Sequence, residues 1–134
     1  MSINKGYQTY QHNAVHTASS GELTLMLYNG CIKFIKQAMK DIDEHNYEAK
    51  NNNIQKAQNI IQELMLTLDP KIEISKQILP LYEYMHHLLK EANIQNEITE
   101  LEEVLQLVSE FRDTWKQVIL KNRKTEQSVQ GAQV

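Results

Sequence analysis

The sequence predicts an all-α protein, namely an antiparallel up-down-up-down four-helix bundle with a short N-terminal amphipathic segment. Apolar side chains recur every three to four residues through four separate segments. The 134 residues include only four Gly and two Pro, so few positions break a helix. The breaks between the segments are short, and short connections force neighbouring helices to run antiparallel. Helices of about 22 residues, each roughly 33 Å long, then match in length.

The first helix is expected over residues 22–43. Ser19 and Glu22 fit a capping box, in which the hydroxyl and the carboxylate satisfy free backbone N–H groups at the helix start. Gly30 lies inside this helix, where it costs about 1 kcal/mol relative to Ala. Either another helix approaches the backbone closely at Gly30, or a glycine on the surface is simply tolerated.

A proline between the second and third predicted helices marks where the second one stops. The second is expected over residues 47–68, with Asn46 as its N-cap and Asp69-Pro70 as its stop, because the residue before a proline is driven out of the helical region. The third is expected over residues 75–92. It contains Pro80, which removes one backbone hydrogen bond. The apolar face continues on both sides of Pro80, so we expect one continuous, kinked helix.

The fourth helix is expected over residues 97–122, which completes a single domain spanning residues 1–134. Within this domain we expect an N-terminal segment at 1–18, the helical bundle at 19–122, and a polar, flexible tail at 123–134.

The N-terminal segment has an amphipathic pattern of its own. Ile3, Tyr7, Tyr10 and Ala14 follow helical spacing, but one or two turns are too short to be stable alone in water. We therefore interpret the segment as a removable plug in a groove that a partner helix also occupies.

Two of the predicted helices carry more apolar surface than a bundle requires. A bundle helix needs an apolar stripe somewhat over about 100° wide. The second and third helices have bounded stripes of that kind and are expected to be ordinary core helices. The first and fourth helices spread apolar residues over roughly 180°. Either loops and tails cover the excess, or it marks a binding site for a partner.

No pattern in the sequence predicts catalysis, and we expect neither catalytic residues, nor a metal, nor a cofactor. His86 and His87 are adjacent, so on a helix they point about 100° apart and cannot chelate one metal well. His12 and His16 have a suitable spacing but no third ligand nearby. Cys31 lies in the apolar arc and is expected to be a core residue. The sequence also lacks a phosphate loop, a nucleophile elbow and an HExxH motif.

Composition predicts a cytoplasmic protein. The net charge of −3 argues against binding to nucleic acid. A single cysteine excludes an intramolecular disulfide and fits a reducing compartment. The first twenty residues lack the apolar core of a signal peptide, and no apolar run is long enough for insertion into a membrane.

The stretch from Thr17 to Gly30, TASSGELTLMLYNG, resembles the start of the flagellar export chaperones of the FliS family. That family commonly reads Thr-Ala-Ser-Pro-x-x-Leu followed by Met-Leu-Tyr-Asp-Gly. Ser20 stands here in place of the proline and Asn29 in place of the aspartate, and both changes keep a helix-start or polar character. The resemblance spans about residues 7–116, and its later pieces are KAQNIIQEL at 56–64, LYEYM at 81–85 and RDTW at 112–115.

The resemblance implies a function in flagellar assembly. It implies a helical bundle that binds the C-terminal region of flagellin in the cytoplasm, blocks premature polymerisation and holds flagellin ready for the flagellar type III export gate. The bound region would be unstructured when free and would fold into helices along grooves of the chaperone, which agrees with the surplus apolar surface. A generic helical adaptor that regulates another protein, and a small bundle enzyme or metal carrier, are the alternative readings.

The candidate residues for the groove and its plug come from three segments. The aromatic residues of the N-terminal segment match family positions, and those of the first helix lie at the margin of its apolar arc. For the second helix, plain core packing is the alternative interpretation. The candidates are Tyr7 and Tyr10 in the N-terminal segment, Leu25, Met26 and Asn29 in the first helix, and Ile54, Ile61, Leu64 and Leu68 in the second.

Overall fold

The computed structural model describes the backbone of residues 20–132 and the side chains of residues 21–122. This part of the chain contains four α-helices and no strand. In chain order they are α2 (Ser20–Asp43), α3 (Tyr47–Leu66), α4 (Glu73–Gln95) and α5 (Thr99–Ala132).

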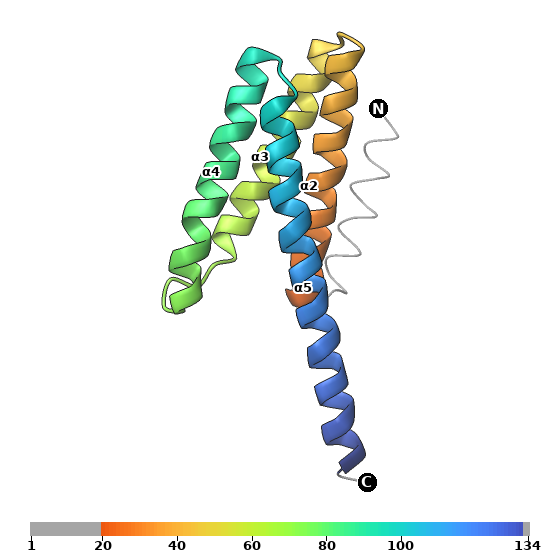
Figure 1. The fold of residues 1–134 in the computed structure, drawn as a ribbon. Helices are drawn as coiled ribbons and strands as arrows, with labels where there is room; N and C mark the ends of the chain where they lie inside the picture. Colours follow the sequence, from red (N-terminus) through yellow and green to blue (C-terminus); the bar gives the residue numbers. More distant parts are fainter. Residues whose placement is uncertain (1–19, 133–134) are drawn as a thin grey trace, which may run out of the picture.

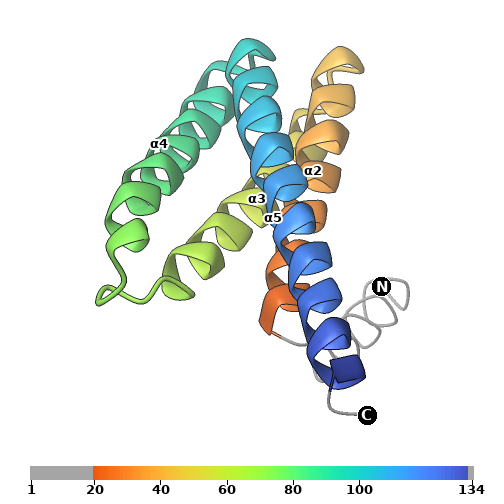
Figure 2. The same cartoon turned by 60° about the horizontal axis from the view of Figure 1, so that its bottom comes forward.

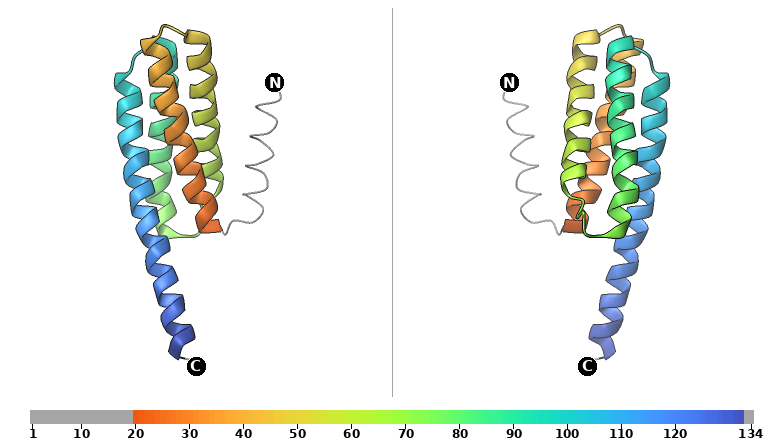
Figure 3. Two further views of the ribbon diagram at one scale, coloured as in Figure 1. Left: turned by 90° about the vertical axis from the view of Figure 1, so that its right-hand side faces the viewer. Right: turned by 90° about the vertical axis from the view of Figure 1, so that its left-hand side faces the viewer.

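The helices form an antiparallel bundle in which chain neighbours lie side by side (Figure 1). α2 packs against α3 and α5, and α4 packs against the same two helices. The predicted up-down-up-down four-helix bundle is therefore confirmed. At one end, the turn between α3 and α4 lies apart from the lower half of α5 (Figures 1 and 2). Figure 3 shows from both sides that α5 continues well beyond the other three helices.

The start of α3 and the continuity of α4 through Pro80 agree with the sequence predictions, and the kink at Pro80 stays a prediction. The Asn46 Oδ1 atom accepts a hydrogen bond from the Ala49 backbone N–H at 3.2 Å, as an N-cap should. Helix α4 runs without interruption through Pro80. It ends at Gln95, and its C-cap Asn96 adopts a left-handed conformation with φ of 56°, a conformation that asparagine tolerates better than most residues.

Helix α5 ends ten residues later than predicted, at Ala132 and not at Asn122. Between Asn96 and Gly131 the sequence contains no Gly or Pro that would stop a helix. Polarity alone suggested a tail, but polar residues without a breaker are compatible with helical backbone. The flexibility predicted for residues 123–134 stays a prediction.

The core also accounts for Gly30 and Cys31. A Cβ atom added at Gly30 would lie 3.3 Å from Cδ1 of Ile60, so α3 approaches the backbone of α2 closely at this point. Cys31 is completely buried, and burial raises the pKa of its thiol to about 12. It is a core residue, as the sequence predicted.

Polar contacts connect the helices at both ends of the bundle. Near the turn between α2 and α3, the buried carboxylate of Asp41 accepts a hydrogen bond from Asn53 Nδ2 at 2.7 Å. The ammonium of Lys50 donates to the Asn93 carbonyl at 2.8 Å and to Asn96 Oδ1, which ties the start of α3 to the end of α4. Desolvation lowers the pKa of Lys50. At the other end, Trp115 Nε1 donates to the carbonyl of Gly21 at 2.8 Å and fixes α5 against the start of α2.

A buried tyrosine pair links α2 to α4 inside the core. The hydroxyls of Tyr28 and Tyr82 are 2.6 Å apart and form a hydrogen bond. The ring of Phe111, from α5, lies 6.3 Å from the Tyr28 ring and 5.9 Å from the Tyr82 ring, measured between centroids. Desolvation raises the pKa of both tyrosines, because the low-dielectric core disfavours the phenolate.

This pair makes the stability of the protein sensitive to alkaline pH. Tyrosine in an unfolded chain ionises near pH 10, whereas Tyr28 and Tyr82 stay neutral to higher pH in the folded state. Their contribution is complete below about pH 10 and decreases above it, since the unfolded chain then releases protons more readily. We expect the melting temperature to fall between about pH 10 and 11, and to fall less in a variant with both Tyr28→Phe and Tyr82→Phe. That variant keeps Cys31, and because burial also raises the pKa of this thiol, part of the decrease at alkaline pH should remain. Identical pH profiles of melting temperature for the variant and the native protein would contradict the assignment to the two tyrosines.

Candidate protein-binding surface

Two exposed apolar side chains in the first half of α4, Ile74 and Leu81, lie on the same stripe as its buried ones. Ile74, Leu81 and Leu88 are seven residues apart, or about two turns, so they share one face of the helix. Leu88 is 7% exposed, Leu81 is 41% exposed and Ile74 is 54% exposed. The stripe is therefore core at one end of α4 and solvent-accessible at the other.

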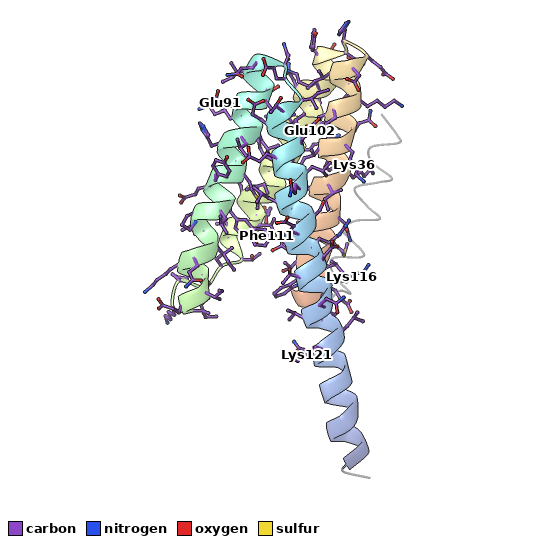
Figure 4. All side chains as sticks on the ribbon, in the orientation of Figure 1. Lys36, Glu91, Glu102, Phe111, Lys116 and Lys121 are labelled. Carbon is purple, nitrogen blue, oxygen red and sulfur yellow. The ribbon has the colours of Figure 1, made fainter. Side chains whose placement is uncertain are left out.

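Helix α5 has a similar apolar stripe, but its side chains become more exposed along the chain, whereas those of the α4 stripe become more buried. Val104, Phe111 and Val118 are also spaced by seven residues; Val104 is completely buried, Phe111 is half-buried and Val118 is 39% exposed. Figure 4 shows Phe111 on the side of α5 that faces α4. Because the two helices are antiparallel, both stripes lose burial toward the same end of the bundle.

Two side-chain contacts set the register of α4 against α5. The Tyr84 hydroxyl donates a hydrogen bond to Glu103 Oε1 at 2.5 Å. The aromatic rings of Tyr82 and Phe111 pack edge to face. Beyond these contacts the two helices separate, since the lower end of α4 lies away from α5 (Figure 1). We call the exposed part of the two stripes the apolar track, formed by Ile74, Ile78 and Leu81 of α4 and by Phe111 and Val118 of α5.

More exposed apolar residues lie beside the turn between α3 and α4. Leu66, at the end of α3, is 80% exposed, and Ile72, just before α4, is 52% exposed. Leu79 and Leu120 are exposed as well. Soluble proteins rarely leave this many large apolar side chains together at one end, so the end of the bundle near the turn between α3 and α4 is a candidate binding surface.

The structure shifts the predicted apolar surplus from the first helix to the third. No large apolar side chain of α2 among residues 21–43 is mostly exposed. The prediction that the third helix is an ordinary core helix is wrong for its first half, where Ile74 and Leu81 are exposed. The prediction for the fourth helix agrees with the exposure of Val118 and Leu120. The sequence did contain a signal for exposed apolar surface at this end of α4. Ile72, just before the helix, and Leu79 are apolar residues that lie outside its core stripe.

The site residues predicted on the second helix are mostly core residues. Ile54, Ile61 and Leu64 have no exposed surface, and Leu68 is half-buried against the same core. A partner cannot contact the first three while the bundle is intact, which favours the core-packing alternative for them.

The remaining predicted residues divide between the surface of α2 and the undescribed N-terminal segment. Leu25 and Met26 are half-buried on α2, and Asn29 is exposed on the same helix. Tyr7 and Tyr10 lie outside the described residues, so their assignment to a plug stays a prediction.

Among residues 21–122, no three His, Cys, Asp or Glu side chains come together as they would around a metal ion. Within the described part of the chain, no helix is both long and apolar enough to cross a bilayer.

Comparison with known proteins identifies the family. The family model described as "Flagellar protein FliS" matches residues 3–122. The chain is 52% identical over 124 residues to the flagellar secretion chaperone FliS of Bacillus subtilis (strain 168), which covers 92% of this chain and 93% of that protein. It is 33% identical over 123 residues to the FliS of Escherichia coli (strain K12), with 87% and 90% covered.

A solved structure shares the fold. It is described as "Crystal structure of flagellar chaperone from bacteria" and matches with a TM-score of 0.72 at 17% identity, covering 89% of this chain and 98% of that one. The family model and the sequence relatives both extend over nearly the whole bundle. This chain belongs to the FliS family of flagellar secretion chaperones.

Proposed function

We propose that this protein is a flagellin-specific export chaperone of the cytoplasm. It binds the disordered C-terminal region of flagellin, prevents premature polymerisation, and presents flagellin to the flagellar type III export gate. The single observation that supports this proposal most directly is the apolar track, because it is an apolar surface on two helices that is left open on a folded bundle.

The dimensions of the track suit a helix that folds upon binding. From Ile74 to Leu81 the exposed part of the α4 stripe extends for about 10 Å, or about two helical turns. A partner helix with apolar residues at every third or fourth position can place one anchor against each turn. Ile74, Leu81 and Val118 each keep about half of their surface available, so burying them contributes roughly 1 kcal/mol apiece.

A segment that is unstructured before binding is a suitable occupant for such a surface. Ordering it costs conformational entropy, and the apolar area buried must offset that cost. Contacts that continue past the track to Leu66, Ile72 and Leu120 would supply more of this area. The flagellar secretion role of the relatives makes flagellin the partner that we infer.

Calorimetric titration tests the proposed partner. The purified chain is titrated with full-length monomeric flagellin and with flagellin that lacks its C-terminal region. We expect saturable binding to the first and no detectable binding to the second, because the apolar anchors lie in the deleted region. Equal binding to both would overturn the proposed mode of recognition. The absence of binding to either would overturn flagellin as the partner.

A further inference from the structure

Helix α4 is hydrogen-bonded to other parts of the bundle only after Pro80, as far as the described residues show. These contacts are Tyr82 with Tyr28 at 2.6 Å, Tyr84 with Glu103 at 2.5 Å, His86 with Gln62 at 3.4 Å, and the Asn93 carbonyl with Lys50 at 2.8 Å. Among the described residues, the side chains of 73–79 form no hydrogen bond or ion pair with another helix, since Lys76 pairs only with Glu73 of its own helix. The start of α4 is therefore held by packing alone.

Burial along α4 changes at the same residue. Five side chains after Pro80 are buried, namely Tyr82, Met85, Leu88, Leu89 and Ala92. Before Pro80 the buried side chain is Ser75, and Ile78 is half-buried against the core. Ile74 is 54% exposed and Leu79 is 37% exposed. We call residues 73–79 the lip, because they form one edge of the apolar track where α4 lies apart from α5 (Figure 1).

Pro80 also weakens the connection between the lip and the rest of α4. Its ring nitrogen carries no hydrogen, so the helix lacks the bond from position 80 to the Lys76 carbonyl. Sharp bends in helices occur mostly at proline. At its other end the lip follows the non-helical residues 67–72. A proline that is simply tolerated in a rigid helix is the alternative interpretation, but such a helix would be held equally on both sides of the proline.

We propose that the lip is hinged at Pro80 and closes toward α5 over the segment that occupies the apolar track. The lip is about 10 Å long, so a bend of about 20° moves Glu73 by about 4 Å. This movement brings Ile74 against the occupant and lets the track accept helices whose apolar side chains differ in size. The closure rests on the proposed function, because it needs an occupant, whereas the hinge itself does not.

Double electron–electron resonance measures the distance across the open end of the track. Nitroxide labels are attached to a variant with Glu73→Cys on the lip and Lys116→Cys on α5. The control variant carries His87→Cys and Glu102→Cys, which join the same two helices farther along α4, where the hydrogen bonds lie. All four positions are exposed, whereas Cys31 is completely buried and stays unlabelled in the folded protein. Circular dichroism confirms that the labelled variants are folded.

In the free chain we expect a broader distance distribution for the lip pair than for the control pair. Pro80→Ala restores the missing N–H and should narrow the lip distribution to the width of the control pair. Pro70→Ala, which changes a proline in the turn before α4, should leave it broad. Saturation with full-length flagellin should narrow the lip distribution and shorten its mean by about 4 Å, and leave the control pair unchanged.

The free-chain measurements decide the hinge without flagellin. Equal widths for the two label pairs, or a lip distribution that Pro80→Ala leaves unchanged, would contradict it. A flagellin-bound chain with an unchanged or longer lip distance would contradict the closure. A chain that does not bind flagellin would instead contradict the proposed function, and the comparison of the native chain with Pro80→Ala would still support or overturn the hinge.

Discussion

A Leu81→Asp variant is expected to bind the C-terminal region of flagellin about 100-fold more weakly than the native chain, which corresponds to about 2.8 kcal/mol. Leu81 is 41% exposed in the free protein and is the residue at which the apolar track on α4 meets the core. A carboxylate at this position remains hydrated while the surface is free, but it loses water without gaining a partner once a helix covers it. Central, desolvated positions of an interface have the largest effects when they are changed.

The matched control for this variant is Ile94→Asp. Ile94 belongs to the same helix and is 66% exposed, but it lies near the other end of α4 from the apolar track. The measurement is calorimetric titration with full-length flagellin, together with far-ultraviolet circular dichroism and thermal melting of each variant. Both variants should keep their helical content, and only Leu81→Asp should lose affinity. Equal affinity in the two variants would place the flagellin site elsewhere on the bundle.

Leu64→Ala is expected to destabilise the bundle by about 3 kcal/mol and to lower its melting temperature by about 10 °C. Leu64 is completely buried in the core cluster, so its truncation loses apolar burial and leaves a cavity that the helices only partly fill. Core replacements of this type typically cost about 2–5 kcal/mol. This variant also tests whether a residue predicted from the sequence as a binding residue acts in the core instead.

Leu66→Ala provides the comparison within the same turn of α3. Leu66 is 80% exposed, so its truncation should change the free energy of unfolding by less than about 0.5 kcal/mol. Urea denaturation at neutral pH measures both variants. For Leu64→Ala we also expect flagellin affinity to change by less than about tenfold at a temperature where the variant is folded. A stable Leu64→Ala protein with lost affinity would reverse the assignment.

The sequence predicted the helices well because their signals are local. Asn46 is the N-cap of α3 since its side chain reaches a backbone N–H three residues away, and that spacing is visible in the sequence. Pro80 was correctly placed within a continuous helix because the apolar period continues across it. The end of α5 was predicted less well, since polarity and helix formation are separate properties and no breaker precedes Gly131.

The candidate site was only partly predictable. Helical periodicity identifies the residues on an apolar face, but it does not say how far along the helix a neighbour covers that face. Ile61 and Ile74 are both isoleucines on apolar stripes, yet the first has no exposed surface and the second is 54% exposed. The difference arises because α3 is packed between α2 and α4, whereas the start of α4 lies apart from α5.

The sequence by itself determined the helical class, the order of four antiparallel helices and the resemblance to a family, because each depends on periods, caps and motifs within short stretches of chain. Only the tertiary structure decided which apolar residues remain accessible. That property depends on the separation of α4 from α5, a relationship between residues distant in the chain. The surplus apolar surface that the sequence assigned to the first and fourth helices thus became a track between α4 and α5.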